Sequence, residues 1–244
     1  MVAASAAVVL VAVAPAAVSA VAAVALAAAA LLVVGDMTAD KFFNDQEKDR
    51  IQQAIVAAES KTAGEIVPMI VTSSARYTEV ELYGLIAGLF LGLIIEWLWS
   101  DPWGSPFVNL WPMVGACAGF LLGQVPAIKR LVTPKTRVDA AVHTLALASF
   151  TQHGLHYTRD HTGILILISL LEHRVEVLAD RGINTKVEPA TWQEISKIVA
   201  DGLKANQACE AVCKAISRCG EILAAHFPRR SDDRNELPDR LVTG

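Results

Sequence analysis

The chain has 244 residues with a formal net charge of -4, and 53% of its residues are hydrophobic. The slightly acidic balance, without a basic stripe or interleaved aromatic and basic residues, argues against nucleic acid as a partner. The mean hydropathy of +0.41 is too high for an ordinary soluble protein. The apolar excess lies in three stretches, namely residues 1–35, Leu82–Trp99 and Phe107–Ile128.

The N-terminal segment, residues 1–36, consists almost entirely of Ala and Val. It has no basic opening of the kind a secretory signal carries, and its apolar stretch is longer than that of a typical signal. One interpretation is a transmembrane helix over about Ala16–Val34. The other is that the biological product begins at Met37. Both stay open at this point.

The first part of a folded domain is expected over residues 37–80. Apolar positions at helical spacing predict a helix that Thr38 or Asp40 caps and that Gly64 ends. Glu65–Val71 is a short apolar run typical of a strand. Pro68 within it indicates an edge strand or a bulge, because proline cannot donate to a neighbouring strand.

A transmembrane hairpin is predicted over residues 81–130. Each of the two inner apolar runs is about as long as the roughly 20 residues that cross a bilayer as a helix, and the short segment Ser100–Pro106 joins them. Glycines at every fourth position would give each helix a groove for close packing. These are Gly84, Gly88 and Gly92 in the first run and Gly115, Gly119 and Gly123 in the second. The two helices are therefore expected to pack on each other.

The aromatic and histidine content of the hairpin adds two expectations. Tryptophans near the joining segment predict an interfacial belt, formed by Trp97, Trp99, Trp103 and Trp111. No histidine lies in any apolar run. We therefore expect no axial haem or chlorophyll ligand in the spans.

The second part of the domain is expected over residues 131–227, followed by an extended polar tail at 228–244. The predicted elements are a helix at Arg137–His153 ended by Gly154, a buried strand at Gly163–Leu170, a half-exposed strand at Arg174–Ala179, and helices at Pro189–Leu203 and Asn206–His226. Helices and strands in this order indicate an α/β fold, a small sandwich with a mixed sheet that the hairpin interrupts.

Several short motifs resemble the TPM-domain family, which includes a thylakoid-lumen protein, a photosystem II repair protein and a modulator of acetylcholine receptors. The matching segments are Thr62–Val67, Asp160–Ile168 and Arg174–Ile183. The chain is most similar to the bacterial membrane-anchored branch, because it contains His226-Phe227-Pro228 and Asn235-Glu236-Leu237-Pro238.

The resemblance implies a divalent-cation site with weak phosphatase activity, at positions Asp160 and Asp180. If the two strands between them form an antiparallel hairpin, these carboxylates lie at one end of it, and such oxygens suit Ca²⁺ or Mg²⁺. The alternative is that Asp160 caps a turn and Asp180 pairs with Arg181 or Arg159. The chain also departs from the family's usual Gly-x-Gly pattern here, with Asp180-Arg181-Gly182.

The charges beside the apolar runs predict the orientation of the domain. The joining segment carries one charge, Asp101, whereas Arg76, Lys129 and Arg130 stand on the other side with Lys135 and Arg137. By the positive-inside rule the soluble domain faces the cytoplasm, at the bacterial inner membrane.

The expected function is that of a non-catalytic accessory protein that stabilises, or helps to assemble or repair, a larger membrane complex, photosynthetic or respiratory. Its partners would be membrane lipid and that complex. The alternatives are a membrane-tethered, metal-dependent phosphatase of low activity and a regulator of an envelope protein. Fold analogy alone does not choose among them.

Overall fold

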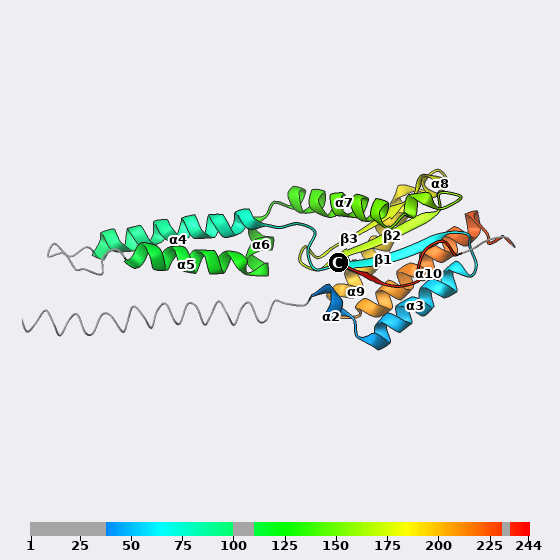
Figure 1. Cartoon of the computed structure of the whole chain (residues 1–244), viewed down its shortest axis with the longest axis horizontal. Helices are drawn as coiled ribbons and strands as arrows, with labels where there is room; N and C mark the ends of the chain where they lie inside the picture. The colour runs from blue at the N-terminus through cyan, green and yellow to red at the C-terminus, as the bar shows by residue number, and fades with distance from the viewer. Residues whose placement is uncertain (1–37, 100–109, 231–234) are drawn as a thin grey trace, which may run out of the picture. The chain divides into compact units, whose positions relative to one another are not determined.

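The computed structural model describes residues 38–99, 110–230 and 235–244. These residues belong to two compact units. One is a helical unit within Arg76–Pro134, and the other is an α/β unit made of Met37–Ala75 and Lys135–Gly244. Figure 1 labels their helices and strands. The N-terminal segment, residues 1–36, lies outside the described residues.

The helical unit is an antiparallel pair of helices followed by a short bent one. Its elements are α4 (Thr78–Trp99), α5 (Leu110–Gln124) and α6 (Pro126–Val132). Gly84 of α4 faces Gly119, whereas Gly92 faces Trp111, so α4 and α5 run in opposite directions. The second apolar run does not continue as one helix to Ile128. Pro126 occupies the first turn of α6, where its missing N–H is tolerated, and α6 is bent by 87° from α5.

Only part of the helical unit meets the length and composition of a membrane span. Within the described residues, one helix, over Thr78–Leu98, is long and apolar enough to cross a membrane. Helices α5 and α6 pass the same test only as a bent pair. The transmembrane character of the hairpin therefore stays a prediction.

The α/β unit contains a mixed four-stranded sheet in the order β3-β2-β1-β4. Its strands are β1 (Glu65–Val71), β2 (Gly163–Ser169), β3 (Arg174–Ala179) and β4 (Val242–Thr243). Strand β1 runs parallel to both β2 and β4, whereas β2 and β3 are antiparallel. The predicted α/β fold with a mixed sheet is thus confirmed.

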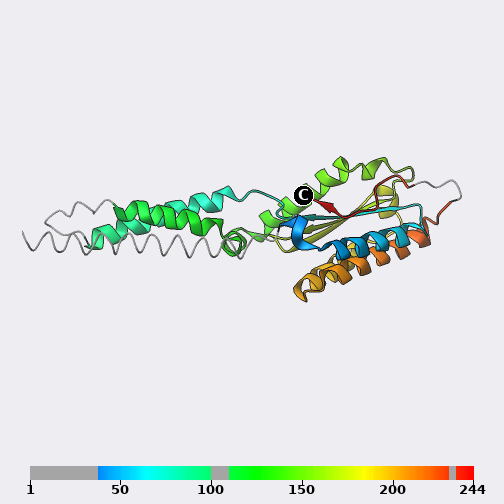
Figure 2. The ribbon, with the colours of Figure 1, turned by 60° about the horizontal axis from the view of Figure 1, so that its bottom comes forward.

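Helices cover both faces of this sheet, as Figures 1 and 2 show. The helices are α2 (Ala39–Phe42), α3 (Asp45–Glu59), α7 (Lys135–Gln152), α8 (Arg181–Asn184), α9 (Pro189–Lys204) and α10 (Ala208–His226), with a 3₁₀ turn at Leu155–Tyr157. Alternate side chains of a strand point to opposite faces. Ile66 and Ile166 therefore pack into the core with α3, α9 and α10. Val67 and Leu165 face α7.

Helices α3 and α10 lie side by side on one face of the sheet (Figure 2). A glycine sets their closest approach, because a Cβ added to Gly220 would lie 2.7 Å from the Cβ of Ala58. The same layer buries Ile51, Ile55 and Val212 completely. This packing fixes the C-terminal end of α3 beside the start of β1.

The first predicted helix is broken in two at Asn44. The Asn44 side chain accepts a hydrogen bond from the N–H of Glu47 at 2.8 Å, and the Glu47 carboxylate accepts one from the N–H of Asn44 at 2.9 Å. This reciprocal capping box starts α3 and separates it from α2. The prediction of one continuous helix is therefore wrong.

The C-terminal segment, residues 235–244, contains β4, which the sequence did not predict. The N–H of Thr72 donates to Gly244 at 3.3 Å, and that of Gly244 donates to Ile70 at 3.1 Å. Successive residues of a strand point their backbone groups to opposite edges, so Pro68 shares the outer edge with Ile70 and Thr72. Among the described residues β4 pairs only with Met69 and Ile70. The predicted edge strand or bulge is therefore wrong, because β1 lies between β2 and β4 and pairs with β2 without interruption. Pro68 is tolerated because β4 does not extend to it.

Candidate functional site

Glycines line the contact between α4 and α5. At each of these glycines, the backbone of one helix lies close to the backbone of the other. A Cβ added to Gly88 would lie 2.0 Å from the carbonyl oxygen of Gly115, and one added to Gly119 would lie 1.9 Å from that of Gly84. The same holds, within 2.7 Å, along the whole seam: Gly84, Gly88, Gly92, Gly115, Gly119 and Gly123. No other residue fits there without separating the helices.

The outer surface of the same helices is apolar. Phe90 is 60% exposed and Trp97 is 76% exposed. Further exposed side chains on both helices are Leu82, Tyr83, Ile86, Leu89, Leu91, Leu93, Ile94, Leu98, Leu110, Met113, Phe120 and Leu122. A soluble helix pair has the reverse arrangement, with large apolar side chains between its helices. Contiguous apolar surface of this kind marks contact with lipid or with another protein.

Charged and aromatic residues occupy the ends of the hairpin. Lys129 of α6 pairs with Glu81 of α4 at 2.8 Å, with both side chains largely buried. At the opposite end Trp97 is exposed, whereas Trp111 is partly buried beside Gly92. The side chain of Trp99 and all of Trp103 lie outside the described residues.

Asp160 and Asp180 lie at the same end of the β2–β3 pair, since the N–H of Asp180 donates to the carbonyl of Gly163 at 2.9 Å. Each carboxylate meets a basic side chain. Asp160 contacts Arg230 at 3.3 Å, and Asp180 contacts His161 at 3.3 Å. Asp180 also caps α8 by accepting the N–H of Arg181 at 2.6 Å. Among the described residues, neither belongs to a group of three metal-ligating side chains.

A group of three carboxyl groups that the sequence did not predict lies elsewhere in the α/β unit. It consists of Glu59 at the end of α3, Glu65 at the start of β1 and Asp239 in the C-terminal segment. One carboxylate oxygen from each lies within 4.8 Å of the others. Glu65 is 7% exposed, whereas Glu59 and Asp239 are partly buried. Oxygen ligands so arranged can bind a hard cation.

Burial controls the electrostatics of this acidic cluster (Glu59, Glu65 and Asp239). Burial raises the pKa of Glu59 to about 9, and the nearby Glu65 and Asp239 charges add to the effect. Burial likewise raises the pKa of Glu65 to about 7, although the N–H of Glu236 opposes it by donating to the carboxylate. The crowded charges therefore need protons or a cation to balance them.

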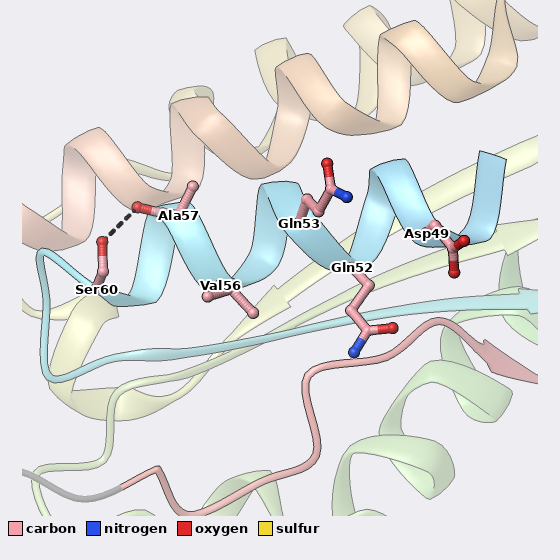
Figure 3. Close-up of a pocket in the computed structure, with 6 residues that line it drawn as sticks. All are labelled: Asp49, Gln52, Gln53, Val56, Ala57 and Ser60. Carbon is pink, nitrogen blue, oxygen red and sulfur yellow. Dashed lines mark hydrogen bonds between the residues drawn. The ribbon is translucent and has the colours of Figure 1, made fainter. Parts of the chain in front are cut away.

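A hollow on the surface of the α/β unit is of a different kind. Figure 3 shows it along α3, where Asp49, Gln52, Gln53, Val56, Ala57 and Ser60 line a space of about 440 Å³. The Ser60 hydroxyl donates to the carbonyl of Ala57 at 2.8 Å. Within this described lining, Asp49 is the single ionisable side chain. The hollow thus supplies neither a set of metal ligands nor a nucleophile beside a base.

The comparisons with known proteins agree with this fold. The family model described as the TPM domain matches residues 128–222. The NMR structure of the BA42 protein from the psychrophilic bacterium Bizionia argentinensis matches with a TM-score of 0.53 at 19% identity, over 83% of this chain and 96% of that chain. No curated protein matches the chain. The resemblance to the TPM-domain family, which the sequence motifs predict, is therefore confirmed over residues 128–222.

Proposed function

We propose that the chain is a membrane-anchored, non-catalytic accessory protein, in which the α4–α5 hairpin crosses the bacterial inner membrane and the TPM-type unit serves a larger membrane complex from the cytoplasmic side. The observation that carries this proposal is the inverted packing of the hairpin, with glycines inside and large apolar side chains outside. Lipid matches the apolar outer surface of the hairpin. The glycines between the helices fit the same setting, because small residues let membrane helices approach closely.

The dimensions of the hairpin support this assignment. Helix α4 has 22 residues, which at about 1.5 Å per residue span about 33 Å, enough for a hydrocarbon core of about 30 Å. The described part of the second helix, α5, has 15 residues. It is shorter than the core, and the apolar run predicted from the sequence begins earlier, at Phe107.

Helix α6 has the features of a segment at the membrane surface. It is bent by 87° from α5, as a helix would be on turning from the bilayer normal into the interface. Leu131 is 86% exposed and Val132 is 49% exposed, so both are free to enter the lipid. Lys129 and Arg130 stand beside them and suit the headgroup region.

Two observations favour a cytoplasmic accessory role over the phosphatase alternative. They are the charges beside the hairpin and the contacts of Asp160 and Asp180. Basic residues gather beside α4 and α6, whereas the joining segment carries Asp101 alone. Asp160 pairs with Arg230, whose guanidinium competes with a cation for the charge of this carboxylate, and Asp180 contacts His161.

Membrane insertion is tested by a charge placed on the outer face of α4. Phe90→Lys should move a large fraction of the chain from the carbonate-resistant membrane fraction to the soluble or aggregated fraction. A lysine near mid-bilayer costs about 2.5–3.5 kcal/mol on insertion scales. Val56→Lys, at an exposed apolar position of α3, is the matched control and should leave the distribution unchanged. If carbonate released the unaltered chain from the membrane fraction, the proposed membrane anchor would be refuted.

The accessory role and the orientation need their own measurements. Trypsin should digest the α/β unit in inside-out vesicles but not in intact spheroplasts, and digestion in spheroplasts would reverse the proposed orientation. Purification in mild detergent should co-isolate a membrane complex at fixed stoichiometry. Hydrolysis of p-nitrophenyl phosphate that is lost in Asp160→Asn with Asp180→Asn would instead support the phosphatase alternative.

A further inference from the structure

The acidic cluster joins three segments that are far apart in the chain. Glu59 ends α3, Glu65 begins β1, and Asp239 belongs to the C-terminal segment. In the part of the chain that the structure describes, no lysine, arginine or histidine forms an ion pair with any of the three. Buried carboxylates without a positive partner are costly to keep charged.

Hydrogen bonds hold each of these carboxylates by one oxygen, from backbone N–H groups for the two glutamates and from a side chain for the aspartate. The N–H of Ile66 donates to Oε1 of Glu59 at 2.8 Å, and that of Glu236 donates to Oε1 of Glu65 at 3.0 Å. The side-chain amide of Asn235 donates to Oδ1 of Asp239 at 2.5 Å. Such donors limit the rotation of each carboxylate, as outer hydrogen bonds do at metal sites, and one oxygen from each group lies within 4.8 Å of the others.

Among the described residues, the second oxygen of Glu65 has no hydrogen-bond partner. Its Oε2 is buried, in a residue that is only 7% exposed. A proton shared between Glu59 and Asp239 would join that pair but would leave Oε2 of Glu65 unpartnered. A cation would engage all three groups together, and buried polar atoms are rarely left without a partner.

We propose that Glu59, Glu65 and Asp239 bind one divalent cation of the oxygen-preferring class, with Ca²⁺ favoured over Mg²⁺, and that this cation fastens the C-terminal segment to the start of β1. Two oxygens bound to one Ca²⁺ lie at most about 5 Å apart, twice the 2.3–2.6 Å bond length, whereas Mg²⁺ allows about 4.2 Å. The observed limit of 4.8 Å therefore accommodates Ca²⁺ with little movement. Water completes the coordination from the side of the partly buried Glu59 and Asp239.

Calorimetric titration of the full-length chain tests the site, with CaCl₂ and MgCl₂ added to protein that was treated with a chelator in a non-ionic detergent. We expect one Ca²⁺ per chain, bound more tightly than Mg²⁺. Glu65→Gln and Asp239→Asn should each weaken binding about tenfold or more, since charge count sets the affinity of such sites. Glu236→Gln should change it less than about threefold, because the Glu236 side chain accepts the N–H of Arg159 at 3.1 Å instead.

Thermal unfolding separates loss of the site from loss of the fold. Without Ca²⁺, Glu65→Gln should melt at the same temperature as the unaltered chain or higher, because the amide removes a buried charge. With Ca²⁺, only the unaltered chain and Glu236→Gln should gain stability. Hydrogen exchange of residues 235–244 should slow on Ca²⁺ addition in those two proteins alone.

Three results would overturn the assignment. They are no saturable Ca²⁺ binding to the unaltered chain, binding that survives both Glu65→Gln and Asp239→Asn, and binding that is lost only in Asp160→Asn with Asp180→Asn. The last would place the cation at the end of the β2–β3 pair. None of these results depends on whether the hairpin spans a membrane.

Discussion

A single methyl group at Gly88 should weaken the α4–α5 hairpin. In Gly88→Ala the new Cβ would lie 2.0 Å from the carbonyl oxygen of Gly115 and 3.1 Å from the Cα of Gly119. Ordinary contact begins at 3.4 Å, so the helices would have to separate by about 1.4 Å at this level. This separation would also break the neighbouring contacts of Gly84 with Gly119 and of Gly92 with Trp111.

Two opposing effects set the magnitude. Overpacking costs about 1–3 kcal/mol, and a clash with a backbone atom belongs at the upper end of that range. Alanine in place of glycine favours the helix by about 1 kcal/mol. The net expectation is a loss of about 2 kcal/mol. If Gly88 did not contact α5, the propensity term alone would remain, and the variant would be more stable than the unaltered chain.

The sign of the change is therefore the measurement that matters. Unfolding in mixed micelles of SDS and a non-ionic detergent, followed by tryptophan fluorescence, should show Gly88→Ala unfolding at a lower SDS fraction. Ala87→Leu adds more atoms, but Ala87 is exposed, and the change should stay within about 0.5 kcal/mol. A Gly88→Ala protein as stable as the unaltered chain, or more so, would refute the close contact.

Three further predictions concern the α/β unit. Asn44→Ala removes one half of the capping box and should lower the free energy of unfolding in urea by about 1 kcal/mol, whereas an unchanged midpoint would deny the cap a role. Ile166→Ala truncates a fully buried side chain and should cost about 2–5 kcal/mol, seen as a lower melting temperature; a cost below that of Val56→Ala on the surface would contradict its place in the core. Burial raises the pKa of Cys219 to about 12, so its reactive thiolate is scarce at neutral pH. Mass spectrometry should find Cys219 unmodified by N-ethylmaleimide in the folded protein at pH 7 and modified in urea, and rapid labelling of the folded protein would contradict its burial.

The longer strands could be predicted from the sequence because their burial leaves a local signal. Gly163–Ser169 is a continuous apolar run, which a strand buried on both faces requires, and Arg174–Ala179 alternates. Val242–Thr243 carries no such signal, because two residues have no period and the pairing depends on β1. Asn44 with Glu47 did carry a readable capping signature, which the apolar periodicity on either side concealed.

The acidic cluster could not be predicted because its members meet only in the folded chain. Glu59 and Glu65 stand near each other in sequence, and Glu65 opens an otherwise apolar strand. That local signal pointed to a motif but not to a third ligand. Asp239 reaches them because β4 directs the C-terminal segment along β1. Residues 65 and 239 are therefore close in space although most of the domain lies between them in the sequence. Asp160 and Asp180 were easier to associate, since an antiparallel pair of adjacent strands joins them.

The position of β1 in the chain has a consequence for biosynthesis. All seven of its residues are buried, and Glu65 pairs with Gly163 of a strand that is made only after the hairpin. While the ribosome completes the hairpin, β1 is an apolar strand with both edges open, the kind of segment that aggregates with other chains. Pro68 interrupts the row of donors at the edge that β4 later pairs with only at Met69 and Ile70, and a proline at such an edge opposes pairing with another chain.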